Sequence, residues 1–192
     1  MSQPNPKALE FLLTRRSRPA KTLAPPVPDR DALLPILTAA ARSPDHGKLE
    51  PWRFIVLERK ALLRLSELVE TSGKRLDRDQ NDIAKAKLAF SSSHLAVAVI
   101  ESPKTSDKIP AIEQTYSAGA VCLALLNASL ASGWGANWIT GWPAHDREFV
   151  ETGLGLSSVE RVSGIVHIGT ETARPQDRPR PEIESITEWM SR

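Results

Sequence analysis

The sequence predicts an α+β protein in which about four strands alternate with five or six helices. Three observations support this class. Several segments carry apolar residues at helical spacing, one six-residue run is apolar on both faces like a buried strand, and prolines or glycines separate the segments. The chain has 192 residues, of which 41% are hydrophobic and 25% charged, so we expect one globular domain over residues 1–192.

Five segments have the hydrophobic pattern of a helix: residues 7–14, 29–41, 59–69, 111–132 and 146–154. Asp29 is placed to cap the second helix, although Pro35 within it removes a backbone hydrogen bond. The segment 111–132 is apolar nearly all round in its middle, which predicts a buried helix ending at Gly133. The polar stretch 72–93 is a further helix candidate with a mobile start.

Four segments are expected to be strands: residues 53–58, 95–100, 136–140 and 162–169. Residues 95–100 are apolar throughout, so this strand should lie in the centre of the sheet. After the last strand the chain is rich in proline and arginine, which predicts an extended C-terminal arm over residues 172–192.

Charge and composition exclude several classes of protein. The net charge of +2 is too small for a nucleic-acid-binding protein. Cys122 is the only cysteine, so neither a disulfide nor a cysteine-based zinc site is expected. The N-terminal residues lack the apolar core of a secretory signal, and the apolar stretch 118–126 is far shorter than the roughly 20 residues that span a bilayer. We expect a cytoplasmic protein with no metal, nucleic-acid or membrane partner.

Motifs for several common chemistries are absent from the sequence. It has no GxxxxGK[ST] phosphate loop, no GxGxxG after a strand, no HExxH pair and no GxSxG nucleophile elbow. No side-chain nucleophile has a recognisable base beside it, so we predict no catalytic residue. If the protein is an enzyme, a bound cofactor should carry the reaction.

A basic segment, Arg15, Arg16 and Ser17, closes the first predicted helix. Two guanidinium groups and a hydroxyl can hold a phosphate through several hydrogen bonds. Alternatively, the arginines complement the negative end of the helix dipole and otherwise lie in solvent. Both interpretations remain open for this segment taken alone.

The loop over residues 43–51 follows the second helix and lies between two prolines, an arrangement on which binding residues are often placed. Arg42 immediately precedes it, and Asp45 and His46 lie within it. The Asp45–His46 pair permits a proton relay. In the alternative, Asp45 makes an Asx turn and His46 forms a hydrogen bond to another group.

Trp134, Trp138 and Trp142 recur every four residues, which predicts that they share one face of a helix or a strand. Nearby glycines, including Gly133 and Gly141, argue against a helix. The three rings either pack in the core or form an aromatic wall beside a planar ligand.

Proline residues keep the segment 174–181 extended, so Arg178 and Arg180 should point in fixed directions. This part of the arm is a surface tail, an arm that wraps a partner subunit, or an arm that reaches a phosphate.

Together these motifs resemble those of the nitroreductase family of FMN-dependent oxidoreductases, in particular its compact YdjA-like branch. The resemblance covers residues 9–186. The motifs that carry it are Arg15-Arg16-Ser17, residues 41–46, residues 50–54, residues 133–138, and Ile168-Gly169-Thr170 with Arg180-Pro181.

The resemblance implies a nitroreductase-like fold, with a central and mostly antiparallel sheet of four to five strands flanked by helices. It also implies a homodimer with FMN at the subunit interface. By position, the FMN-binding residues are Arg15, Arg16, Ser17 and Arg180 for the phosphate end, Trp138, Ile139 and Thr140 for the ring, and Arg42 and His46 from the other subunit. Arg178 is the alternative to Arg180. Ile139 stands where relatives can carry a polar residue, so only its backbone can bond the flavin.

The implied activity is the transfer of hydride from NADH or NADPH to FMN, followed by reduction of a small acceptor such as a nitroaromatic compound or a quinone. One pocket that holds one ligand at a time makes the kinetics ping-pong. The alternative is a flavin- or anion-binding module without turnover, because binding residues do not establish chemistry.

Overall fold

A five-stranded antiparallel sheet forms the centre of the computed structural model, which describes residues 3–191. Its strands are β1 (Leu23–Ala24), β2 (Trp52–Glu58), β3 (Leu95–Glu101), β4 (Gly135–Ile139) and β5 (Arg161–Glu171). β5 pairs with β1, β3 and β4, and β2 pairs with β3. All residues of β3 are buried, as its apolar sequence predicts.

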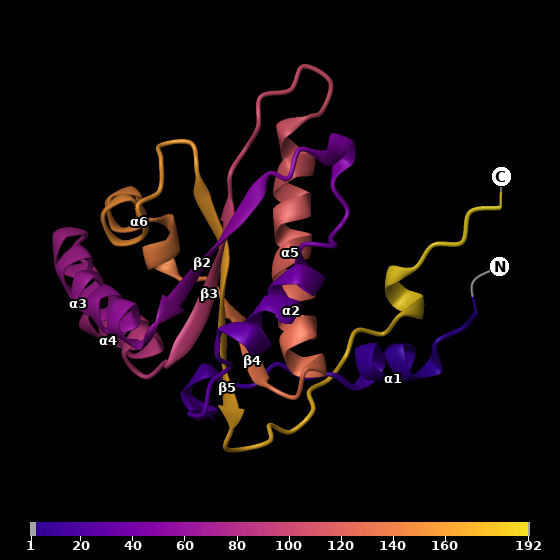
Figure 1. Cartoon of the computed structure of the whole chain (residues 1–192), viewed down its shortest axis with the longest axis horizontal. Coiled ribbons are helices and arrows are strands. Elements are labelled where there is room, and N and C mark those ends of the chain that lie inside the picture. Colours follow the sequence, from indigo (N-terminus) through magenta and orange to yellow (C-terminus); the bar gives the residue numbers. More distant parts are fainter. Residues whose placement is uncertain (1–2, 192) are drawn as a thin grey trace.

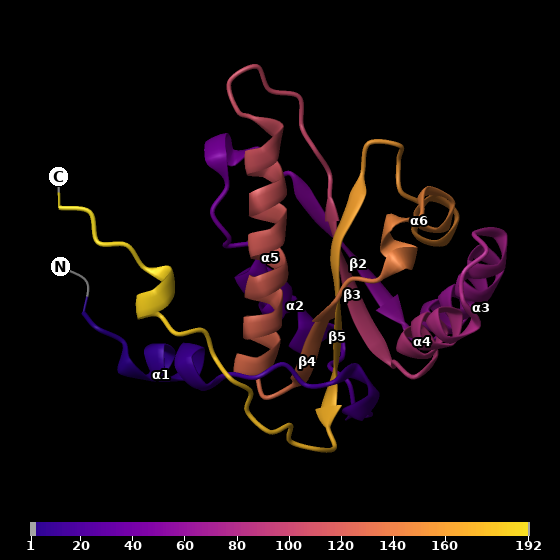
Figure 2. The ribbon, with the colours of Figure 1, turned by 180° about the vertical axis from the view of Figure 1, so that it is seen from behind.

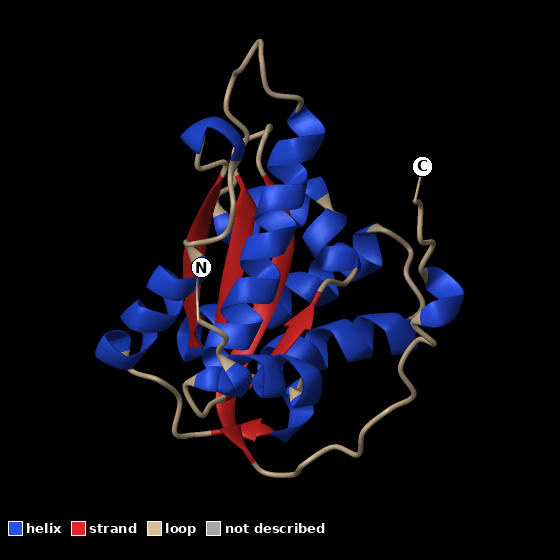
Figure 3. Cartoon of the chain, turned by 90° about the vertical axis from the view of Figure 1, so that its right-hand side faces the viewer, coloured by secondary structure: helices blue, strands red, loops and turns tan. Residues whose placement is uncertain are grey.

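Helices cover both faces of this sheet (Figure 1). The α-helices of residues 3–191 are α1 (Pro6–Thr14), which projects from the molecule (Figure 1), and α2 (Arg30–Ala40), α3 (Arg59–Arg75), α4 (Gln80–Ser91), α5 (Ala111–Ala131) and α6 (Arg147–Leu154). α2 and α5 lie on one face, which Figure 3 shows toward the viewer, and α3, α4 and α6 lie on the other. The arrangement confirms the predicted α+β class.

Two apolar cores result, one on each side of the sheet. On the α2–α5 side, Ile36 and Leu125 pack against Val97 of β3. On the other side, Leu65 and Phe149 belong to the second core. Alternate residues of β3 contribute to the two cores, because successive side chains of a strand point to opposite faces.

The four predicted strands are confirmed, with every end within two residues of the expected one, and the remaining differences in this part of the fold have local reasons. β1 has only two residues, too few to carry a hydrophobic pattern. β4 ends at Ile139, so Thr140 follows the strand instead of closing it. α2 continues through Pro35 because Leu33 and Ile36 are buried against the sheet on either side of it.

The helical region after β2 differs from the prediction. α3 runs to Arg75, well beyond the expected end at residue 69, and the stretch 72–93 divides into the end of α3, a turn and α4. Ser72 and Gly73 are buried although they are not hydrophobic, and a Cβ on Gly73 would come within 2.5 Å of the Ile83 side chain. Small residues let α3 and α4 approach closely, a signal that apolar spacing does not contain.

Helix α1 and the C-terminal arm both lie on the α5 side of the molecule. α1 extends outward beyond α5, and the arm that follows β5 returns beside it (Figures 1 and 2). The arm contains one short 3-10 turn, Glu184–Ile186, and is exposed over most of its length. Among residues 3–191, no helix combines the length and the hydrophobicity needed to cross a bilayer.

Candidate functional site

The segment after α1 is hydrogen-bonded to the sheet where β4 begins and β5 ends. Arg15 has extended backbone angles, so the chain leaves the helix there. The backbone N–H of Arg18 donates to the carbonyl oxygen of Ala136 in β4 at 2.8 Å, and Arg18 Nε donates to Glu171 Oε2 at the end of β5 at 2.6 Å. These bonds hold Arg15 and Arg16 beside the start of β4.

The C-terminal arm brings further arginines to the same place. Arg16 Nη2 donates to the carbonyl oxygen of Gln176 at 3.1 Å, although the two residues are 160 positions apart in the chain. Arg178 and Arg180 both act electrostatically on Arg15, and Arg180 does so more strongly. We call the resulting group the arginine cluster: Arg15, Arg16, Arg18, Arg178 and Arg180.

Positive charge exceeds negative charge in the arginine cluster. Burial, and then the charges of the other four arginines, lower the pKa of the Arg15 guanidinium. In residues 3–191, only Glu171 and Asp177 form ion pairs with the cluster.

Two buried N–H groups of the cluster also lack an acceptor. Arg15 Nη2 donates to Ser17 Oγ at 3.1 Å, but Arg15 Nε and Arg16 Nε are buried and form no hydrogen bond within the described chain, although Arg16 Nε lies 3.5 Å from Asp177 Oδ1. Buried donors are normally paired, so a ligand with negatively charged oxygens would complete this group. Arg15 and Arg16 are thus partly buried and not fully solvated.

β4 connects the arginine cluster to a cavity. From Gly135 to Ile139 the strand covers about 13 Å at the usual rise per residue. Ile139 and Gly141 line a cavity of about 250 Å³ together with Lys85, Trp142 and His167. The predicted ring-binding segment and the predicted phosphate-binding residues thus lie at opposite ends of one short strand.

The prediction of a shared face for the three tryptophans is wrong. Trp134 packs with the core on the α2–α5 side, whereas Trp142 packs with the core on the other side. Only Trp138 belongs to β4, where its partly exposed ring lies against Gly164 so closely that any Cβ at that position would collide with it. Strand β4 has only five residues, so Trp134 precedes it and Trp142 follows it. The alternation of a strand therefore does not fix the direction of these two side chains.

The cavity contains polar groups that apolar patterning does not reveal. His167 is 2% exposed, and its Nδ1 lies 2.9 Å from Ser93 Oγ. Burial lowers the pKa of His167 to about 4, so the ring is neutral at pH 7. The indole Nε1 of Trp142 is buried and donates to no acceptor among the described residues.

The loop after α2 forms a separate group. His46 Nδ1 lies 2.6 Å from Glu113 Oε2 in the first turn of α5, and Asp45 Oδ2 accepts from the backbone N–H of Glu50 at 2.6 Å. The two side chains therefore do not form the proton relay. His46 bonds to another group, as the alternative predicts, while Asp45 accepts from a residue five positions on instead of making an Asx turn.

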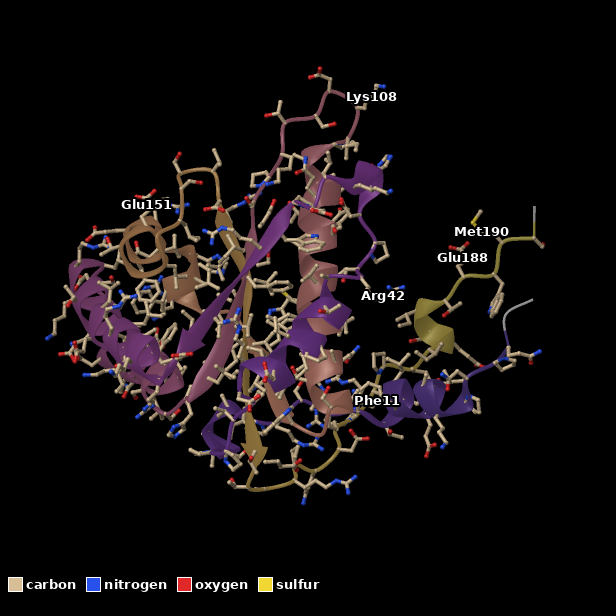
Figure 4. The ribbon with its side chains drawn as sticks, in the orientation of Figure 1. Phe11, Arg42, Lys108, Glu151, Glu188 and Met190 are labelled. Carbon is tan, nitrogen blue, oxygen red and sulfur yellow. The ribbon has the colours of Figure 1, made fainter. Side chains whose placement is uncertain are left out.

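Within one chain, this loop does not join the arginine cluster. His46 contacts Glu113 in the first turn of α5, whereas the cluster is bonded to β4, which follows the end of that helix. From Glu113 to Ala131 the helix is about 27 Å long at 1.5 Å per residue. Arg42 lies in the turn just after α2, on the side of the molecule where Figure 4 also shows Glu188 and Met190 of the arm. The predicted site residues thus fall into two groups per chain.

The sequence model of the Nitroreductase family matches residues 12–170. The chain belongs to the nitroreductase family. It is 33% identical over 163 residues to a protein of Escherichia coli (strain K12) named "Putative NAD(P)H nitroreductase YdjA", covering 85% of this chain and 87% of that protein.

Solved structures of the nitroreductase family share the fold. A nitroreductase-like protein of Bacillus cereus superposes with a TM-score of 0.80 at 23% identity, covering 100% of this chain and 99% of the other. A nitroreductase of Bacteroides fragilis, solved with bound FMN, gives a TM-score of 0.73 at 20% identity, covering 92% and 95% of the two chains. The nitroreductase-like fold expected from the motifs is confirmed.

Sequence reasoning on this nitroreductase-family chain missed several residues of the two sites. Arg18 belongs to the run of basic residues after α1, and this position in the sequence is only a weak indication that it takes part in the cluster. Glu171 and Asp177 carry no such signal, because they meet the arginines only through the fold. Lys85 and His167 reach the cavity from α4 and β5, and neither belongs to a motif.

Proposed function

We propose that this nitroreductase-family protein binds FMN and uses NADH or NADPH to reduce a small acceptor, such as a nitroaromatic compound or a quinone. The arginine cluster is the observation that carries the proposal, because its cations outnumber its carboxylates and two of its buried N–H groups have no described acceptor. The Escherichia coli relative is named for NAD(P)H, and the Bacteroides fragilis structure contains FMN. The cytoplasm, where NADH and NADPH are present, is the proposed location.

The phosphate of FMN fits the cluster by charge and by hydrogen bonding. A phosphate monoester carries close to two negative charges at pH 7 and has three acceptor oxygens. In the proposed complex Arg15 and Arg16 donate to these oxygens through the Nε atoms that lack an acceptor in the described chain, and Arg180 adds a further contact. The Ser17 hydroxyl already accepts from Arg15 and has its own proton free to donate.

The ring of FMN is proposed to lie along β4 and over the following turn. β4 forms ladder bonds with β5 on one edge, and its Ala136 carbonyl oxygen also accepts from the backbone N–H of Arg18. In the proposed complex the ligand bonds to free backbone groups of the other edge toward Ile139. Ile139 contributes backbone groups and an apolar surface, Trp138 an aromatic face, and Thr140 the first hydroxyl after the strand. A planar heteroaromatic ring with polar atoms on one edge suits this combination.

We further propose a homodimer that completes this site with Arg42 and His46 of the second chain. Support comes from apolar side chains that the single chain leaves in solvent. On α1 they are Leu9, Leu12 and Leu13, on α5 Ile112, Tyr116 and Leu123, and on the arm Ile183, Ile186, Trp189 and Met190. Exposed apolar groups gathered on one side of a molecule typically mark an interface.

The chain's own residues bind and orient in the proposed reaction. Bound FMN supplies the chemistry, accepting a hydride from NADH or NADPH and returning the two electrons to the acceptor. Arg15, Arg16 and Arg180 hold the phosphate, and β4 fixes the position of the ring. The buried His167 stays neutral, so it adds no positive charge behind the ring cavity.

The test uses the purified full chain, its visible spectrum after addition of FMN, and then NADH or NADPH without oxygen. The proposal expects a yellow protein whose flavin absorbance disappears on reduction and returns when a nitroaromatic compound or a quinone is added. A protein that binds FMN but stays oxidised would be a flavin-binding module. A protein without affinity for FMN would overturn both. Sedimentation of the flavin-loaded protein tests the dimer, and a flavin-loaded monomer would contradict the two-chain site.

A further inference from the structure

The arginine cluster contains an acidic side chain of its own, contributed by the C-terminal arm. Asp177 Oδ1 accepts from Arg180 Nη2 at 2.8 Å and from the backbone N–H of Arg178 at 2.9 Å. The same oxygen lies 3.5 Å from Arg16 Nε, one of the two buried N–H groups without a hydrogen bond. One carboxylate oxygen is thus surrounded by three donors of the cluster.

The two acidic residues of the cluster are held very differently. Glu171 ends β5, is bonded to Arg18 at 2.6 Å, and has 29% of its side chain exposed. Asp177 lies outside the sheet on the arm, and 72% of its side chain is exposed. Glu171 therefore belongs to the frame of the cluster, whereas Asp177 can leave with a small movement of the arm.

We propose that Asp177 is a displaceable counter-ion, which occupies part of the phosphate position in the free protein and must leave when FMN binds. The inference rests on the proposed function, because the FMN phosphate is the ligand that replaces it. Hydrogen bonds from Arg178 and Arg180 lower the pKa of the Asp177 carboxyl, so it remains charged well below neutral pH.

The exchange has an electrostatic reason. Five arginines face two carboxylates in the free protein, so three positive charges remain uncompensated, and loss of Asp177 alone would leave four. A phosphate brings close to two negative charges and three acceptor oxygens, more than the single charge of Asp177 supplies. Asp177 thus stabilises the free protein and competes with the phosphate, which lowers the affinity for FMN.

The opposite role is also testable. If Asp177 only positioned Arg16 and Arg180 for the ligand, its removal would leave these side chains less ordered and weaken FMN. If it is a counter-ion, its removal tightens FMN while making the free protein less stable. The sign of the change in affinity separates the two.

The experiment compares wild type with Asp177→Asn, which keeps the shape and removes the charge. Glu182→Gln is the matched control, since Glu182 lies on the same exposed arm and its carboxylate takes part in no ion pair among the described residues. Dissociation constants for FMN and for riboflavin, which lacks the phosphate, are measured by flavin fluorescence. Thermal unfolding is followed without flavin, with and without inorganic phosphate.

We expect Asp177→Asn to bind FMN about two- to fivefold more tightly, the range of an exposed ion pair. Riboflavin affinity should not change, the flavin-free variant should melt at a lower temperature, and inorganic phosphate should raise that temperature more than in wild type. Glu182→Gln should match wild type throughout. Equal or weaker FMN binding by Asp177→Asn would overturn the inference. If neither wild type nor the variants bound FMN, but inorganic phosphate stabilised Asp177→Asn more than wild type, the role of Asp177 as a counter-ion would be supported. The proposal that the protein binds FMN would then be wrong.

Discussion

Two regions of this molecule hold arginine side chains among other charges, and they do so in opposite ways. Arg53 of β2 donates from Nε to Glu160 Oε1 at 2.6 Å and from Nη2 to Glu160 Oε2 at 3.0 Å. That pairing raises the pKa of the Arg53 guanidinium and lowers the pKa of Glu160 to about 2. In the arginine cluster the pKa of Arg15 moves down, because it is buried among like charges.

The comparison separates an arginine whose hydrogen-bonding partners are complete within the chain from arginines whose partners are not. The Arg53–Glu160 pair is complete within the chain, with both oxygens of the carboxylate engaged by two parallel N–H groups. The cluster is incomplete, because Arg15 Nε and Arg16 Nε are buried and form no hydrogen bond within residues 3–191. Uncompensated charge costs stability in the free protein and is retained where a ligand relieves it.

The largest expected effect is on flavin affinity. Arg15→Ala should weaken FMN binding roughly ten- to a hundredfold, because a charge-assisted hydrogen bond contributes about 1.5–3 kcal/mol. Arg53→Ala should leave the dissociation constant unchanged, since its only described partner is Glu160. Fluorescence titration of the two variants measures both. Similar losses in the two variants would show that the cluster has no special role.

Stability should respond in the reverse order. Glu160→Ala removes an almost buried carboxylate that accepts from Arg53 and from the backbone N–H of Ser157, so the free energy of unfolding should fall by about 2 kcal/mol. Arg15→Ala removes a like charge from the cluster and should leave the stability of the flavin-free protein unchanged or slightly higher. Urea unfolding at pH 7 gives both values. A large destabilisation by Arg15→Ala would mean that the cluster holds the fold together.

How far the sequence predicts these regions depends on how local their contacts are. Arg15, Arg16 and Ser17 are adjacent, so the sequence alone marks them as a candidate anion site, beside the alternative of a basic helix end. The sequence does not show which arginines of the C-terminal arm lie near this segment. The folded path of the arm brings Arg178 and Arg180 close to Arg15, and it places Asp177 beside Arg16.

The same distinction applies to the fold. Strands β2 to β5 and helix α5 are predicted because their apolar runs are local and bounded by prolines, glycines or polar residues. The length of α3 is not, because it depends on the close approach of Gly73 to Ile83 across two helices. The wall of three tryptophans fails for a related reason, since spacing along the chain cannot show where β4 ends.

Lowering the pH should produce a smaller loss of folding stability through the Arg53–Glu160 pair. The pKa of Glu160 is about 2 in the folded protein and about 4.5 when unfolded, so the unfolded chain takes up the proton first as the pH falls. The stabilisation is complete above about pH 4.5 and is lost between there and pH 2. We expect wild type to lose about 1 kcal/mol by pH 3.5 through this group, after allowance for solvent around Arg53.

The variant Glu160→Gln isolates this contribution. Its free energy of unfolding should depend less on pH than that of wild type between pH 5 and pH 2.5 or thereabouts. Urea titrations at several pH values supply the comparison. Parallel pH profiles for the two proteins would place the acid sensitivity elsewhere in the molecule.

Salt gives the smallest effect and reverses its sign between the two regions. Sodium chloride screens repulsion in the cluster, so wild type should gain a few tenths of a kcal/mol relative to Arg15→Ala as the Debye length shortens. The same salt screens attraction at Glu160, so wild type should lose a similar amount relative to Arg53→Ala. The buffer must contain no phosphate, which would bind the cluster and imitate screening. If the cluster is incomplete and the Arg53–Glu160 pair complete, the two differences in stability change in opposite directions as the salt concentration rises. Changes in the same direction would mean that the charge of Arg15 is compensated within the chain.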